Sequence, residues 1–114
     1  MLFRSLGDSL RAVTLGGDWV GADLASRLAR QVPGCRFAGL GGATETAIHN
    51  TICEVVGEPP AHAATVPFGV PLRNVRCRVV SPSGRDCPDW VPGEFWVGGA
   101  NVAAGYRNDP ERTA

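Results

Sequence analysis

Two short apolar runs separated by an amphipathic stretch constrain the fold more than any other feature of the sequence. Residues 10–15 (LRAVTL) end at a glycine pair, which is typical of a buried strand stopped by a turn. Residues 21–32 carry apolar side chains at helical spacing, and Pro33-Gly34 ends that pattern. Residues 35–40 form the second apolar run. The order strand, helix, strand predicts the unit that builds a parallel sheet with a right-handed crossover.

The chain changes character after residue 58, where prolines become frequent. Residues 74–80 alternate apolar side chains with arginines, which indicates a half-exposed strand, and residues 93–98 form a second strand. Near the end, Asn108 or Asp109 caps a helix with Pro110 in its first turn. We therefore predict an α/β fold, with a mostly parallel sheet in residues 8–58 and a small barrel-like, β-rich part in residues 59–114.

Within the first part, the stretch FAGLGGATETAIHNT at residues 37–51 is open to two interpretations. It is either a tight turn leaving a strand or a loop that holds a phosphate, since glycine serves both. It matches neither the P-loop nor the dinucleotide-binding spacing. However, the Thr44 hydroxyl can hydrogen-bond a phosphate oxygen, and the adjacent Glu45 carboxylate is a suitable magnesium ligand. At the carboxyl end of a strand the loop would lie where ligands bind in open α/β sheets.

The bulk composition argues against several partners and sites. Eleven basic and eleven acidic residues leave no net charge, so nothing favours nucleic acid or an anionic membrane as a partner. The four cysteines contain no C-x-x-C pair, which argues against zinc and favours buried, reduced thiols. No stretch is typical of a signal peptide or a membrane span, so we expect a cytoplasmic protein.

Several ordered motifs together carry a resemblance to a known family. They are GLGGATET (39–46), VPFGVPLRNVRCRVV (66–80), GEFWVGGANVAAGY (93–106) and NDPERTA (108–114). In this order they resemble the adenylation domains of nonribosomal peptide synthetases, which are adenylate-forming ligases related to acyl-CoA ligases. The resemblance begins near Asp8 and implies that residues 1–114 are part of an AMP-binding adenylation core.

The resemblance implies roles for the glycine loop. Thr44 would contact the α-phosphate of ATP and Glu45 would help to place Mg²⁺, so both are candidate catalytic residues and Glu45 is the candidate metal ligand. The remaining nucleotide contacts would come from the loop backbone. These residues are Gly39, Gly41, Gly42 and Ala43, together with Thr44. Many members of the family have an adenine-stacking aromatic residue where this chain has Gly41.

The resemblance also implies a substrate pocket. GGDW at 16–19 and LGGATE at 40–45 are similar to adenylation domains in modules that cyclise cysteine, serine or threonine. The residues lining the amino-acid site would include Thr14, Gly16, Leu40, Ile48 and His49. Leu40 and Ile48 match a cysteine-loading pocket, whereas His49 stands where tryptophan is expected, so the identity of the amino acid stays open.

The implied activity is formation of an aminoacyl-adenylate for a siderophore or another secondary metabolite. The cofactors would be ATP and Mg²⁺. The partners would be a peptidyl carrier domain bearing phosphopantetheine and a condensation or cyclisation domain. The family's phosphate-gripping lysine loop, ribose-binding aspartate and mobile carboxy-terminal lysine have no counterpart in this sequence, so we expect the isolated chain to be inactive.

Two alternatives stay open at the level of sequence. The first is a fragment of an acyl-CoA ligase, which shares the phosphate loop but accepts a carboxylic acid without the amine. The second is a non-catalytic module that binds a partner through an exposed face formed by Arg73, Arg76 and Arg78.

Overall fold

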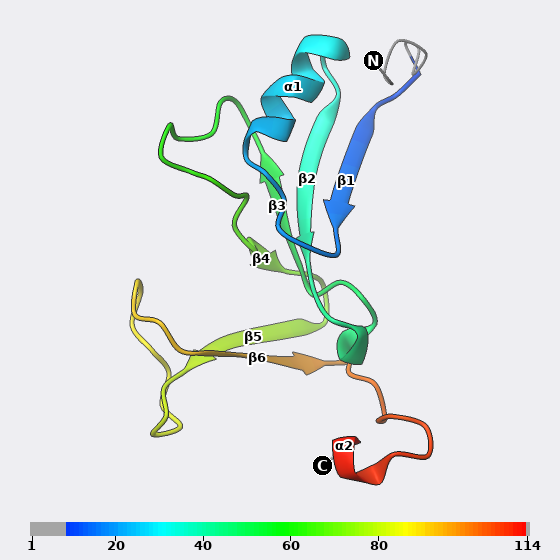
Figure 1. Ribbon diagram of the computed structural model, residues 1–114, viewed down its shortest axis with the longest axis vertical. Helices are drawn as coiled ribbons and strands as arrows, with labels where there is room; N and C mark the ends of the chain where they lie inside the picture. Colours follow the sequence, from blue (N-terminus) through cyan, green and yellow to red (C-terminus); the bar gives the residue numbers. More distant parts are fainter. Residues whose placement is uncertain (1–8, 114) are drawn as a thin grey trace.

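The computed structural model describes residues 9–113, which form a small sheet with a helix on it and a separate strand ribbon beneath (Figure 1). In chain order the elements are β1 (Ala12–Gly16), α1 (Asp23–Gln31), β2 (Arg36–Gly41), η1 (Thr44–Thr46), β3 (Thr51–Val55), β4 (Val70–Pro71), β5 (Val75–Val80), β6 (Glu94–Gly99) and α2 (Pro110–Thr113). The predicted strands and helices are all found, with ends shifted by a residue or two.

The first sheet has the strand order β1-β2-β3-β4. β1 and β2 are parallel, and α1 is the crossover between them. The pairs β2–β3 and β3–β4 are antiparallel, so the prediction of a mostly parallel sheet is wrong beyond the first strand pair. Residues 42–50, which connect β2 to β3, are fewer than the roughly dozen residues that a parallel crossover requires, so the chain reverses direction there.

The predicted barrel-like part is instead a two-stranded antiparallel ribbon, β5–β6. The ribbon runs across the direction of the sheet strands in Figure 1. An ion pair of 2.7 Å between Arg78 and Asp86 ties β5 to the loop that leads to β6. Within residues 9–113 no other strand pairs with the ribbon edges, and two strands cannot close on themselves, so the barrel prediction is wrong.

The apolar core is small because few elements stack on one another. α1 covers one face of the first sheet (Figure 1). In the described part of the chain, the buried apolar side chains are Ala22, Ala25, Phe37, Ala38 and Val80. The radius of gyration is 17.1 Å, compared with about 13 Å for a compact domain of about 100 residues, because the ribbon and α2 project from the sheet.

The structure also bears on the burial of the cysteines and on the expected lack of a membrane span. All four cysteines are free thiols, and they are half-buried where we expected buried side chains. Burial raises the pKa of the Cys77 thiol. Among residues 9–113, neither helix has the length and apolar character that a membrane crossing needs.

Candidate functional site

The glycine loop lies at the edge of the sheet where the parallel strands β1 and β2 end. β2 ends at Gly41 and η1 begins at Thr44, so the glycines connect the strand to the turn. The Asn50 amide donates to the Gly41 carbonyl at 2.7 Å, and the Ile48 amide donates to the Ala43 carbonyl at 3.0 Å. These bonds close the loop onto the strand end. In Figure 1, η1 lies between this edge of the sheet and the end of the β5–β6 ribbon.

The backbone after η1 is unusual. Ala47 has a φ of 54° and Ile48 a φ of 76°, a left-handed conformation that β-branched residues rarely adopt. The chain passes so close to Gly42 that a Cβ at that position would collide with the Ile48 carbonyl oxygen. The conformation of the loop therefore requires a residue without a side chain at position 42.

A cavity of about 340 Å³ lies beside the end of β2. Its lining includes the glycines Gly39, Gly41 and Gly42 and the aromatic residues Trp19 and Phe68. A Cβ on Gly41 would collide with the Phe68 ring, so this ring occupies the space next to the glycine. The volume falls at the lower end of the range of small-molecule sites. Glycine backbone and aromatic rings together suit a flat organic group.

The predicted substrate residues are grouped largely around the paired ends of β1 and β2. Gly16 is the register partner of Leu40, and Thr14 lies on the same face of β1, two positions earlier. A Cβ on Gly16 would lie 3.2 Å from the Leu40 Cβ and 3.3 Å from the His49 Cε1. The structure thus brings Gly16, Leu40 and His49 together. Ile48 is not buried within this cluster, because 66% of its surface is exposed.

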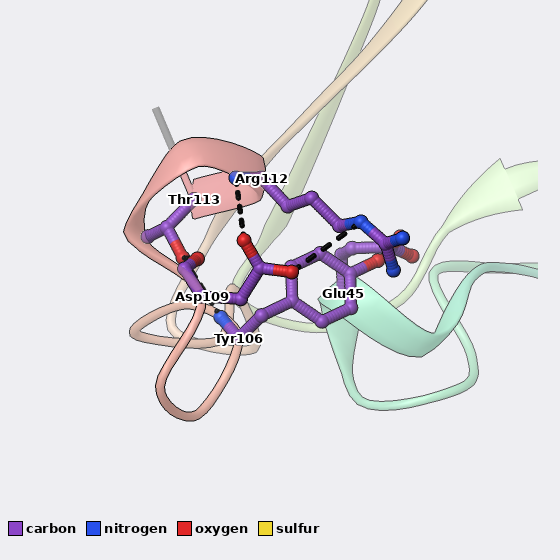
Figure 2. Close-up of polar contacts among 5 residues, drawn as sticks. All are labelled: Glu45, Tyr106, Asp109, Arg112 and Thr113. Carbon is purple, nitrogen blue, oxygen red and sulfur yellow. Dashed lines mark hydrogen bonds and ion pairs between the residues drawn. The ribbon is translucent and has the colours of Figure 1, made fainter.

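The Thr44 and Glu45 side chains are exposed on η1. Figure 2 shows the Tyr106 hydroxyl directed toward Glu45, where it donates a hydrogen bond to Oε1 and leaves Oε2 outside that bond. This hydrogen bond lowers the pKa of Glu45 below the ordinary carboxyl value and raises the pKa of the Tyr106 phenol. Glu45 is therefore a charged carboxylate at neutral pH, as a metal ligand must be.

A segment far along the chain fastens the η1 turn to the ribbon. The Asn101 side-chain amide donates to the Thr46 carbonyl and to the Asn50 Oδ1, both at 2.9 Å. The Ala103 amide donates to the Glu45 carbonyl at 2.8 Å. The sequence assigned no chemistry to this segment, because no local pattern indicates contacts between residues this far apart. Phe68 lies in the VPFGVPLRNVRCRVV motif (66–80), to which the sequence likewise assigned no chemistry.

The metal-ligating side chains are dispersed over the described part of the chain. Among residues 9–113, no group of three or more His, Cys, Asp or Glu side chains could hold a metal ion. Magnesium is commonly bound by one or two carboxylates together with the phosphates of a substrate. Glu45 is an exposed carboxylate on the turn that follows the cavity-lining Gly42, and such a side chain fits that mode of binding.

Comparison with protein families identifies the family of the chain. Residues 3–107 match the family model described as AMP-binding enzyme. The chain belongs to the AMP-binding enzyme family. The model spans β1 through β6 and includes the loop with Thr44 and Glu45. Membership confirms the predicted relationship to adenylate-forming ligases.

Curated relatives of this AMP-binding chain are large synthetases. Phenyloxazoline synthase MbtB of Mycobacterium tuberculosis (strain ATCC 25618 / H37Rv) is 62% identical over 108 residues, which are 93% of this chain and 8% of the relative. Pyochelin synthetase PchE of Pseudomonas aeruginosa (strain UCBPP-PA14) is 53% identical over 107 residues, again 93% of this chain and 7% of the relative. The chain thus spans less than a tenth of the length of either relative.

Solved structures support the same assignment. The AMPPNP-bound crystal structure of the nonribosomal peptide synthetase FmoA3 matches this chain with a TM-score of 0.85 and 38% identity. The match covers 94% of this chain and 12% of the FmoA3 chain. IdnL1, at 21% identity and a TM-score of 0.86, shares the fold. The predicted relationship to adenylation domains of nonribosomal peptide synthetases is confirmed.

Proposed function

We propose that the longer protein containing this AMP-binding segment activates an amino acid with ATP. A carboxylate oxygen of the amino acid attacks the α-phosphorus, and the bond from that phosphorus to pyrophosphate breaks. The products are an aminoacyl-adenylate and pyrophosphate. The acyl group then passes to the phosphopantetheine thiol of a peptidyl carrier domain, with release of AMP. The observation that carries this proposal is the exposed Thr44–Glu45 turn, which follows the cavity-lining Gly42 at the carboxyl ends of β1 and β2.

In this proposal the nucleotide lies along the end of β2. Its base enters the cavity and rests on the backbone of Gly39, Gly41 and Gly42, with the Phe68 ring beside it. The Thr44 hydroxyl donates to an α-phosphate oxygen. Glu45 would hold Mg²⁺ through its carboxylate, whose Oε1 also accepts the hydrogen bond from Tyr106. When bound, Mg²⁺ screens the negative charge that otherwise keeps two anions apart.

The amino acid lies next to the cluster of Gly16, Leu40 and His49. We propose a substrate that carries a hydroxyl or thiol on its β-carbon, as serine, threonine and cysteine do. The support comes from the relative named phenyloxazoline synthase. An oxazoline ring contains an oxygen and a nitrogen that a β-hydroxy amino acid supplies when its hydroxyl adds to the preceding amide carbonyl and the carbonyl oxygen leaves as water. A condensation or cyclisation domain of the longer protein would be the partner for that step.

The direct test is exchange of labelled pyrophosphate into ATP by a complete adenylation domain containing this segment. We expect exchange that requires Mg²⁺ and one of cysteine, serine or threonine, because activation of the matching amino acid is reversible until the acyl group is transferred. Exchange that requires a carboxylic acid without an amine would instead support the acyl-CoA ligase alternative. Absence of exchange with any amino or carboxylic acid, from a folded domain, would refute both.

Replacing His49 by tryptophan should change the amino-acid preference of that domain more than its affinity for ATP. The His49 Cε1 atom would lie 3.3 Å from a Cβ placed on Gly16, so the His49 side chain is close to Gly16. The larger indole of tryptophan would reduce the space in that cluster. The measurement compares kcat/KM for cysteine, serine and threonine, and the KM for ATP, between His49→Trp and the unchanged domain. Replacing His62, which is exposed outside the cluster, provides the control. Equal changes for the amino acids and ATP would show that His49 does not line the amino-acid side.

A further inference from the structure

Tyr106 comes from a part of the chain far from the loop that carries Glu45, yet its hydroxyl donates to the Glu45 carboxylate (Figure 2). A hydroxyl that donates to a charged carboxylate forms one of the stronger hydrogen bonds in proteins. The bond engages Oε1 only. It therefore fixes the orientation of an exposed side chain that would otherwise sample several rotamers.

Tyr106 is itself held in place by the turn of α2. Its backbone amide donates to the Thr113 Oγ1 at 3.0 Å, and that hydroxyl donates onward to the Asp109 carbonyl at 2.8 Å. The Asp109 Oδ1 accepts from the Arg112 amide at 3.2 Å and so caps the turn. Figure 2 shows these residues together with the phenol ring and Glu45.

The backbone before Tyr106 also packs tightly on this turn. Gly105 has a φ of 138°, and a Cβ there would collide with the side chain of Thr113. The close approach at Gly105 and the hydrogen bonds fix the backbone position from which the Tyr106 side chain extends. A series of contacts thus runs from α2 through Tyr106 to Glu45.

We propose that Tyr106 is a positioning residue that holds the Glu45 carboxylate ready for the metal ion of the adenylation reaction. This inference rests on the proposed role of Glu45. In it, the phenol engages Oε1 and leaves Oε2 available to the metal ion. Thr113 acts one step further away, because it fixes the backbone from which the phenol extends. The role requires the hydroxyl of Tyr106 and not only its ring.

The test is Tyr106→Phe in a complete adenylation domain, since this change removes the hydroxyl and keeps the ring. We expect the Mg²⁺ concentration for half-maximal pyrophosphate exchange to rise by about tenfold or more, as is typical when a residue that orients a metal ligand is lost. The KM for the amino acid should stay unchanged. Binding of Mn²⁺ in the presence of a non-hydrolysable ATP analogue, followed by electron paramagnetic resonance, should weaken in parallel and gives a readout independent of turnover.

Glu45→Gln separates a failure of this inference from a failure of the proposed function. If Glu45→Gln leaves exchange unchanged, the metal role of Glu45 is wrong and the positioning role fails with it. If Glu45→Gln reduces exchange while Tyr106→Phe leaves the Mg²⁺ requirement and Mn²⁺ binding as they were, only the positioning role is wrong. In the double variant, Tyr106→Phe should have no further effect on the Mg²⁺ requirement, because the carboxylate that Tyr106 would orient for the metal ion is absent.

A matched pair at Thr113 decides the case in which Tyr106→Phe impairs folding. Thr113→Val removes the hydroxyl that accepts from the Tyr106 amide, whereas Thr113→Ser keeps it. We expect Thr113→Val to raise the Mg²⁺ requirement and Thr113→Ser to leave it close to that of the unchanged domain. Equal Mg²⁺ requirements for the two variants would overturn the inference.

Discussion

Glu45→Gln in a complete adenylation domain is expected to lower amino-acid-dependent pyrophosphate exchange by about 100- to 1000-fold, the usual effect of losing one group that stabilises transition-state charge. Glutamine has nearly the same shape as glutamate but no negative charge, so it can accept the hydrogen bond from Tyr106 and still fail as a magnesium ligand. The measurement is the exchange rate at saturating ATP and amino acid over a range of Mg²⁺ concentrations.

Glu54→Gln is the matched control for this prediction. Glu54 is a carboxylate on β3 that pairs with Arg36 at 2.7 Å, and its register partner is Ala38, before the glycine loop. The hydrogen bond with Arg36 lowers the pKa of Glu54, so Glu54 is charged at neutral pH, as Glu45 is. Glu45→Gln and Glu54→Gln therefore each remove one negative charge. We expect Glu54→Gln to retain most of the exchange. Equal losses from both variants would show that Glu45 has no specific role.

Gly42→Ala is expected to cost about 3 kcal/mol of unfolding free energy, the upper range for inserting a methyl group into a filled space. The added Cβ would collide with the Ile48 carbonyl oxygen and come within 2.7 Å of the His49 Cα. Both obstacles are backbone atoms, so no side chain can rotate away to make room. The measurement is the midpoint of urea unfolding for the complete adenylation domain.

Gly98→Ala serves as the control for the glycine prediction. Gly98 lies in β6, and a Cβ added there would meet no atom within 4 Å. The same chemical change should therefore alter the unfolding midpoint little. If Gly98→Ala and Gly42→Ala lowered the unfolding midpoint equally, the loss at Gly42 would not be due to the collision in the loop.

The elements whose pattern is local could be predicted from the sequence. β1, α1 and β2 are each bounded by glycine or proline and follow a clear apolar period, so the strand-helix-strand unit and the loop after β2 were found. β3 was missed because Thr51–Val55 is short and begins directly after the polar end of the loop, without a turn dipeptide to mark it. Without β3 the sheet could not be seen to become antiparallel.

The site could be predicted only in part, for a related reason. Thr44 and Glu45 are adjacent in sequence, so one turn presents both, and the resemblance to adenylation domains implied their roles. Tyr106 reaches Glu45 across 61 positions, and Asn101 reaches Thr46 across 55. Such contacts follow from how the β5–β6 ribbon lies against the sheet, and no period or spacing in one sequence encodes that arrangement.

The left-handed pair Ala47 and Ile48 has a consequence for how fast and how tightly a ligand is bound. Conformations of this kind cost on the order of 1–3 kcal/mol each and persist only where surrounding contacts enforce them. Here the amide of Ile48 is tied to Ala43 and that of Asn50 to Gly41. The cost of ordering the loop is therefore met when the chain folds and not when the ligand arrives. In the proposed nucleotide site, a loop already in its bound conformation would lose no affinity to selection of a rare state and would not need to rearrange before association.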